Sequence, residues 1–361
     1  MESIDAERAA AEIEDNMTTS PPDPQFPDIP FPELPEKRSL TIEAGAPVTG
    51  AAAVGEVMVA TFGDGTLRVF RQDEDPVTRS AHDGAILCLA AGENYVLTGG
   101  DDGRLLRIST NGDIDEVRNF GSRWVDCVAA HTGQFACSSG RVAYLWCGGE
   151  QNPAEFKHPS TIGGLAFDAE GRRLAVAHHG GVTIWAQEIG AWTSTKLEWR
   201  GSHGAVTFSP DGEFVVAALQ ENMLNCWRLQ DGMCTQLYGA AAKVKSFDWV
   251  GDTPFLVVSG GFEAVYWPFN DKEGPNGSDP IRTARGGHVV TVVLGLPGQP
   301  RVLLGSKHGA VTLVNLDDAE PPSFIQDSTG VEITALALSE SRSHLLIGDA
   351  NGRVVWMPVE V

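Results

Sequence analysis

Histidine is the first residue type in this chain whose placement could support chemistry. His178 and His179 lie at one turn, and His308 lies at an equivalent turn much later in the chain. Several imidazoles that face one channel could bind a metal ion. No cluster of carboxylates or cysteines lies beside them in the sequence. We therefore expect exposed or turn-capping histidines, no metal site and no cofactor.

The cysteines and the search for catalytic motifs lead to the same expectation. The six cysteines include no CxxC pair, and most lie within apolar runs: Cys88, Cys127, Cys137, Cys147, Cys226 and Cys234. We expect them to be buried thiols that act as small hydrophobic groups. The chain has no P-loop, GxSxG, HExxH or dinucleotide-binding glycine motif, and residues 99–103 (GGDDG) are typical of a hairpin turn.

Composition and charge restrict the fold class and the partners. The chain of 361 residues contains 41 Gly and 21 Pro, which suits many short strands joined by tight turns. Its formal net charge of −22 disfavours binding to nucleic acid or to anionic lipid. No apolar run is long enough to span a bilayer, and the acidic first residues do not form a secretory signal. We expect a soluble, cytoplasmic protein.

The first residues differ from the rest of the chain. Residues 1–36 hold ten acids and one base, Arg8, and therefore carry −9 of the net charge of −22. Prolines recur every two or three positions in residues 21–36, which favours an extended backbone. We expect residues 1–38 to form a disordered acidic tail. Its regularly spaced apolar residues are a candidate docking motif, or else the tail only solubilises the protein: Phe26, Ile29, Phe31 and Leu34.

From residue 39 onward the sequence repeats. Each unit contains three apolar runs separated by Gly-containing turns, as in residues 82–109, 158–185 and 202–227. The third run closes on a large residue, and these closing positions are spaced 38 to 47 residues apart: Phe70, Ile108, Trp146, Trp185, Trp227, Trp267, Val314 and Trp356. Such a period is typical of propellers, in which each small sheet is covered by its neighbours.

These units resemble WD40 repeats. The resemblance rests on residues 208–212 (FSPDG), on the histidines that open several units and on the tryptophans that close the third run. It covers residues 39–361. No closing tryptophan is followed by Asp, so the buried Asp–His–Ser–Trp network of the family is expected to be incomplete in most units.

The expected fold is an all-β propeller of about eight four-stranded blades, with seven as the alternative. A weaker fourth run follows each closing position, but the last unit ends at Val361 without room for one. We therefore assign residues 39–42 (SLTI) as the outer strand of the last blade, which closes the ring and removes two exposed sheet edges. The predicted domains are the tail, residues 1–38, and the propeller, residues 39–361.

The WD40 resemblance implies a non-catalytic scaffold that binds partner proteins on one ring face. The turns between the second and third runs and the segments that lead into the first run should lie on that face. They supply the candidate contact residues, which are Arg123, Trp124, His179, Asn222, Lys243, Phe262 and His308. Arg–Trp is a common hot-spot pair, although Trp124 could instead pack between blades. The alternative function is a propeller enzyme or metal-dependent module with its site at the central channel.

Overall fold

The computed structural model describes residues 39–361 except 150, 190, 253, 270–271, 276–277, 284–286 and 318–320. The candidate tail residues Phe26, Ile29, Phe31 and Leu34 lie outside this range. The described residues form strands, turns and loops, and none of them is in a helix. No membrane-spanning helix is therefore found in this part of the chain.

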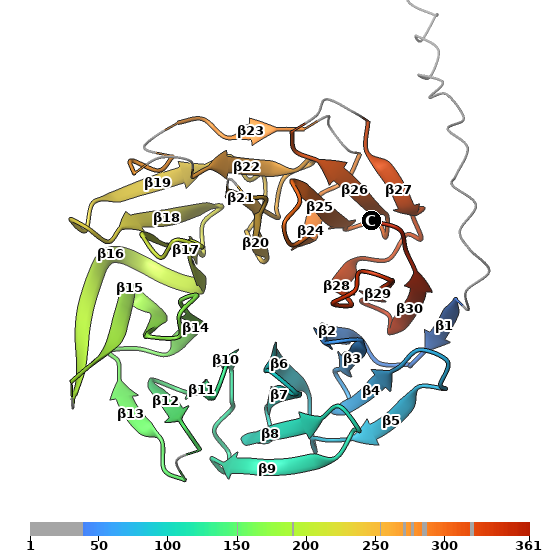
Figure 1. Ribbon diagram of the computed structural model, residues 1–361, viewed down its shortest axis with the longest axis horizontal. Helices are drawn as coiled ribbons and strands as arrows, with labels where there is room; N and C mark the ends of the chain where they lie inside the picture. Colours follow the sequence, from blue (N-terminus) through green and yellow to red (C-terminus); the bar gives the residue numbers. More distant parts are fainter. Residues whose placement is uncertain are drawn as a thin grey trace, which may run out of the picture. The chain divides into compact units, whose positions relative to one another are not determined.

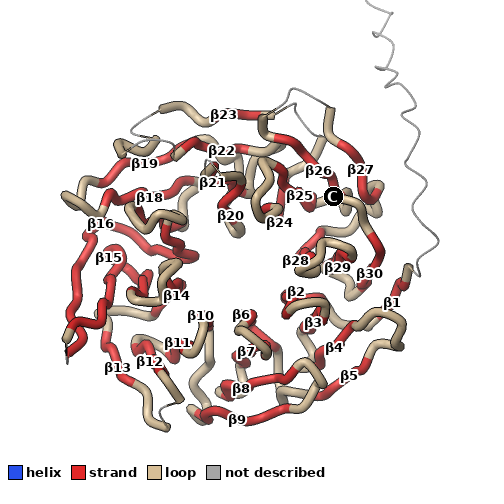
Figure 2. The backbone as a smooth tube through the Cα atoms, viewed as in Figure 1, coloured by secondary structure: helices blue, strands red, loops and turns tan. Residues whose placement is uncertain are grey.

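The strands form seven hydrogen-bonded sheets, which surround a central axis as the blades of a β-propeller (Figures 1 and 2). The first three sheets contain β2 (Val48–Val54), β3 (Val57–Phe62), β4 (Thr66–Phe70) and β5 (Val77–Ser80); β6 (Ile86–Ala91), β7 (Tyr95–Gly100), β8 (Arg104–Ser109) and β9 (Ile114–Asn119); and β10 (Cys127–His131), β11 (Gln134–Ser139), β12 (Val142–Cys147) and β13 (Ala154–Lys157).

The fourth sheet has six strands: β14 (Ile162–Phe167), β15 (Arg173–Glu188), β16 (Ala191–Phe208), β17 (Phe214–Leu219), β18 (Met223–Arg228) and β19 (Cys234–Tyr238). The next two contain β20 (Phe247–Val250), β21 (Phe255–Val258), β22 (Val265–Pro268) and β23 (Ile281–Arg282); and β24 (Val290–Gly295), β25 (Arg301–Ser306), β26 (Val311–Asn315) and β27 (Ser323–Gln326). The last contains β28 (Ile333–Leu338), β29 (His344–Asp349), β30 (Arg353–Pro358) and β1 (Leu40–Glu43).

The sheet count matches the alternative of seven rather than the preferred count of eight separate sheets. The reason is β16, which runs without interruption from one pairing to the next. Its first part pairs with β15, from Ala191↔Glu188 to Ser202↔His179, and its last part pairs with β17, from His203↔Leu219 to Phe208↔Val215. Hydrogen bonding is therefore continuous where the sequence pattern predicts a break between two sheets.

The predicted ring closure is confirmed. Strand β1 pairs antiparallel with β30, the last strand of the chain, in the register Leu40↔Trp356 to Glu43↔Arg353. The described chain therefore begins and ends in the same sheet, as Figure 1 shows. The pairing covers the outer edge of β30 and so removes an exposed edge that could pair with another chain.

Neighbouring sheets cover both faces of each sheet, and the burial of the side chains differs from strand to strand. The second strand is the most buried, as in β17, where every residue is buried, whereas outer strands such as β5 alternate between partly buried and exposed. Of the predicted closing residues, Trp227 and Trp267 are among the largest fully buried side chains. Trp185 is only partly buried.

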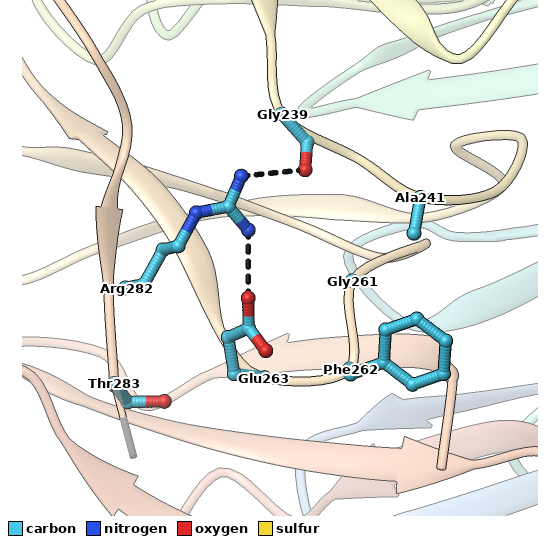
Figure 3. A pocket seen from close by; sticks show the side chains of 7 residues that line it. All are labelled: Gly239, Ala241, Gly261, Phe262, Glu263, Arg282 and Thr283. Carbon is cyan, nitrogen blue, oxygen red and sulfur yellow. Dashed lines mark hydrogen bonds and ion pairs between the residues drawn. The ribbon is translucent and has the colours of Figure 1, made fainter. Parts of the chain in front are cut away.

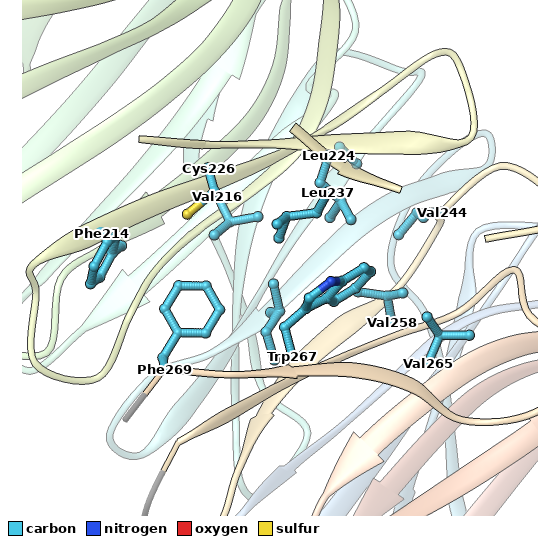
Figure 4. Packing of buried hydrophobic residues seen from close by; sticks show 12 residues of the cluster. Phe214, Val216, Leu224, Cys226, Leu237, Val244, Val258, Val265, Trp267 and Phe269 are labelled. Carbon is cyan, nitrogen blue, oxygen red and sulfur yellow. The ribbon is translucent and has the colours of Figure 1, made fainter. Parts of the chain in front are cut away.

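The core lies between neighbouring sheets rather than at the axis. Figure 4 shows one such cluster, in which Phe214 and Cys226 of β17 and β18 lie on the same side as Leu237 of β19, and Trp267 of β22 belongs to the adjoining sheet. Close packing of sheets requires small residues at some positions. A Cβ atom on Gly348 of β29 would lie 2.5 Å from Val48 Cγ1 in the next sheet, which only glycine avoids.

Candidate functional site

The two predicted sets of turns lie together on one face of the ring. Gly65, between β3 and β4, accepts hydrogen bonds from the backbone N–H groups of Ala81 and His82, both at 3.0 Å, in the segment that leads to β6. Gly260, between β21 and β22, likewise accepts hydrogen bonds from Ala241 and Ala242 before β20. We call the surface formed by these turns and segments the ring face.

Arg123 and Trp124 lie on the ring face, in the segment that leads to β10. All nine tryptophans lie in the described residues, and Trp124 is the only exposed one, with 56% of its surface accessible. Packing between sheets, the alternative that the sequence left open for Trp124, is therefore not observed. The Arg123 guanidinium lies over the Phe120 ring, 6.0 Å from its centre, which is within the range of a cation–π interaction.

The other predicted contact residues are also exposed, but their surroundings differ. Asn222 donates a hydrogen bond from Nδ2 to the carbonyl oxygen of Ala241 at 3.1 Å, which links two neighbouring turns. The His308 ring stacks on the His288 ring with centroids 3.8 Å apart. The remaining three are exposed at other turns of the same face: His179, Lys243 and Phe262.

One buried polar network crosses from the ring face into the sheet β6–β9. His82 Nδ1 lies 2.9 Å from Asp102 Oδ1, and His82 Nε2 lies 2.9 Å from Thr98 Oγ1. Asp102 also accepts hydrogen bonds from the backbone N–H groups of Asp83 and Arg104 at 3.0 Å. Burial raises the pKa of Asp102, but the hydrogen bonds outweigh it and hold the pKa below its usual value. The network fixes the turn between β7 and β8.

Other histidines near the ring face are buried and were not distinguished by the sequence. His203 is buried and receives a hydrogen bond from Asn225 Nδ2 at Nε2, 3.0 Å away, so it is no surface contact. His158 is also buried and lies near His178, with ring centroids 5.2 Å apart. Desolvation, together with the charge of His178, lowers the pKa of His158 to about 4. His158 is therefore neutral at pH 7.

The inner strands surround the axis, where both polar and apolar side chains line a pocket. Several of the inner strands have a register shift near their first residue. A bulge of this kind adds one residue to the strand and changes the direction of its side chain. The residues at these shifts line a pocket of about 410 Å³ on the axis side: Thr49, Leu87, Thr291 and Thr334. Lys245 Nζ lies 3.2 Å from Glu332 Oε1 in the same pocket. This ion pair joins the segments before β20 and β28 past the intervening sheet β24–β27.

A second pocket, of about 510 Å³, opens beside the turn between β21 and β22 (Figure 3). Arg282 lines one side of it and donates hydrogen bonds to Glu263 Oε1 at 2.7 Å and to the Gly239 carbonyl oxygen at 2.8 Å. Ala241 and Phe262 provide its apolar wall. This pocket could not be predicted from the sequence, because its lining residues come from three separate segments.

Five of the six cysteine side chains are poor nucleophiles because burial raises their pKa values: Cys88, Cys127, Cys137, Cys226 and Cys234. All six cysteines lie in the described residues, and none of them forms a disulfide. Burial raises the pKa of Cys127 to about 11. Burial also raises the pKa of Cys234, to about 12, against a smaller lowering by a backbone hydrogen bond. The thiolate is the reactive form, so these thiols are unreactive at pH 7. Within the described part of the chain, no group of three or more His, Cys, Asp or Glu residues is placed to hold a metal ion.

Comparison with known proteins supports the fold and nothing more. No model of a protein family matches the chain, and no curated protein matches it. Among solved structures, it is similar to the crystal structure of the computationally designed Ika8 protein, with a TM-score of 0.69 and 17% sequence identity. The alignment covers 87% of this chain and 97% of that one. At such low identity the likeness shows a shared propeller architecture.

Proposed function

We propose that the protein is a non-catalytic scaffold that binds a partner protein on its ring face. The observation that carries the proposal is the exposure of Trp124 beside Arg123, since the other tryptophans are buried or partly buried. More than half of the Trp124 surface is left in water, which is apolar surface that a partner would bury. Tryptophan and arginine are the residues most enriched at the energetic centres of protein interfaces.

The WD40 resemblance belongs to the same proposal. The His82–Thr98–Asp102 network supports this inference because it combines an Asp, a His and a hydroxyl group. His82 lies in the segment before β6, Thr98 in β7 and Asp102 in the turn after β7. The third strand of this unit closes on Ile108 rather than Trp. We infer that this unit is a degenerate WD40 repeat. We also infer that the protein binds its partner in the cytoplasm.

We infer further that the sheet β14–β19 contains two repeat units, which would make eight in the ring. Within β15, Gln187 N–H donates to the Arg172 carbonyl oxygen at 3.4 Å, so this strand folds back as a hairpin. A buried cluster lies between the two halves of the sheet, with Ala175 and Ile184 on one side and Phe208 and Trp227 on the other. Neighbouring units elsewhere in the ring pack through clusters of the same kind.

Affinity capture from the native cell extract tests the scaffold proposal. The full-length protein, Trp124→Ala and Phe324→Ala would be compared by mass spectrometry. Phe324 is the matched control, because it is 53% exposed but lies on the outer strand β27. We expect a stoichiometric partner that Trp124→Ala loses and Phe324→Ala retains. Equal recovery with both variants would contradict a ring-face site at Trp124.

The N-terminal segment is a second proposed contact. Phe26, Ile29, Phe31 and Leu34 lie outside the described residues, so their role rests on the sequence alone. The same capture with residues 37–361 would separate the two sites. Loss of the partner on truncation would place a docking motif in residues 26–34, whereas retention would leave the ring face as the binding site.

A further inference from the structure

We propose that the part of the ring face over the sheets β20–β23 and β24–β27 binds an acidic peptide segment of the partner, anchored by one apolar side chain. The proposal deepens the scaffold function and rests on it. We call this part of the surface the cationic sector. It consists of Lys243, Lys245, Phe262, His288, Lys307 and His308, all of which are exposed.

The residues of the cationic sector are held together by backbone hydrogen bonds. Ala242, next to Lys243, donates to Gly260 at 2.9 Å, and Gly260 donates to Val290 at 2.8 Å. Lys307 N–H donates to the carbonyl oxygen of Val289 at 2.8 Å. These hydrogen bonds connect the segment that holds Lys243 to the turn that holds Lys307 through the backbone of Gly260 and the segment before β24.

Charge on the ring face is distributed unevenly. Turns and segments over the sheets β2–β5 and β6–β9 carry exposed acids at Asp64 and Asp83. Exposed Asp327 lies at the border of the cationic sector, next to Ser328, whose hydroxyl donates a hydrogen bond to the His308 carbonyl oxygen. In the cationic sector, Glu263 is paired with Arg282 and Glu332 with Lys245. Lys243 and Lys307 therefore create a local positive field on a protein whose formal net charge is −22. Such a field attracts a negatively charged segment and orients it.

The pocket beside Phe262 provides the place for an apolar anchor. Phe262 is 36% exposed and forms the pocket wall with Ala241, which lies two residues before Lys243. Figure 3 shows the Phe262 ring on the opposite side of the pocket from Arg282. A side chain inserted here would bury apolar surface next to the lysines, which combines an apolar pocket with a charged rim.

A short peptide fits this distribution better than a nucleic acid. A polyanion that extended across the ring face would meet the acids at Asp64 and Asp83, and repulsion there would offset its contacts with the lysines. A peptide confined to the cationic sector avoids them. The occupant is therefore a segment rich in Asp and Glu with one aromatic or aliphatic residue.

Peptide selection with the full-length protein tests the proposal. A library of short synthetic peptides would be screened, and the best ligand measured by fluorescence anisotropy. We expect acidic sequences with one conserved apolar residue, and binding that weakens as NaCl is raised. The double variant Lys243→Glu/Lys307→Glu should weaken binding by about tenfold or more. Phe262→Ala should weaken it at every salt concentration, because that contact is apolar.

The matched control is Arg172→Glu/Lys196→Glu, which makes the same change of charge at exposed positions away from the ring face. It should bind the peptide as the parent protein does. Equal weakening by both double variants, selection of neutral or basic peptides, or tighter binding of single-stranded DNA would overturn the proposal. The scaffold function has its own outcome: a partner lost by Trp124→Ala but kept by Lys243→Glu/Lys307→Glu would leave the scaffold intact and reject the cationic sector.

Discussion

Leu40 lies directly opposite Trp356, in the pairing of the first described strand with the last. Leu40 and Ile42 also pack against the buried cluster that contains Phe70 and Trp356, between the sheets β28–β1 and β2–β5. The ring is therefore closed by four residues of β1 that hydrogen-bond at one sheet and pack against the next. Closure makes the stability of the whole ring depend on a short segment.

Truncation tests this dependence. Deletion of residues 1–36 should leave the melting temperature nearly unchanged, because β1 begins at Leu40. Deletion through Glu43 removes β1, exposes the edge of β30 and should lower the melting temperature by about 5 °C or more. Differential scanning calorimetry measures both. If the two truncated proteins melted alike, β1 would not close the ring.

Much of this architecture could be predicted from the sequence. The repeat period located the third strands of the four-stranded sheets, since their closing residues all lie in one, whereas Trp185 lies in the second half of β15. The missing fourth run of the last unit predicted the role of β1. The continuous sheet β14–β19 could not be predicted, because it depends on hydrogen bonds along β16 and not on its apolar pattern.

The site was harder to predict than the fold. The ring-face turns were identified from their glycines, but burial separated residues that look alike in the sequence: Trp124 is exposed, whereas His203 is buried. The pair Lys245–Glu332 joins residues far apart in the chain, so no local motif could indicate it.

Gly348 should be essential for sheet packing. In Gly348→Val the new side chain would collide with Val48, and overpacking of this kind costs about 1–3 kcal/mol in the free energy of unfolding. Gly287→Val is the control, since a Cβ there has no atom within 4 Å and its backbone needs no positive φ. Urea unfolding should show a loss for the first variant and little change for the second. Equal stability of both would show that the sheets can separate without cost.

Asp102 should stabilise its turn more than Asp64 stabilises the equivalent turn of the preceding unit. Asp102→Asn loses an acceptor for His82 or Asp83 and should cost about 1–3 kcal/mol, whereas exposed Asp64→Asn should cost less. Because hydrogen bonds lower the pKa of Asp102 in the folded state, its contribution is present above the unfolded pKa and is lost as the pH falls through the folded pKa.

The difference in unfolding free energy between the parent protein and Asp102→Asn should therefore shrink in acid. A difference that stayed constant from neutral to acidic pH would contradict the role of the ionised carboxylate.

His158 should make the protein less stable in mild acid. Its folded pKa of about 4 lies below the unfolded value of about 6.5, so the unfolded state binds a proton first as the pH falls. The contribution of His158 to the free energy of unfolding should decrease below about pH 6.5 and level off below about pH 4. His158→Gln should show a smaller decrease between pH 7 and 5, whereas exposed His179→Gln should follow the parent protein. Parallel curves for all three would remove His158 as the cause.

Hydrogen exchange on the complex with the captured partner tests the scaffold account most directly. Amide exchange in full-length protein would be compared with and without the partner, peptide by peptide. If the partner binds the ring face, exchange should be slower in residues 120–126, which include Arg123 and Trp124, and in neighbouring turns of the ring face. Exchange in outer strands such as β5 and β27 should not change. Protection confined to outer strands, with residues 120–126 exchanging as before, would contradict it.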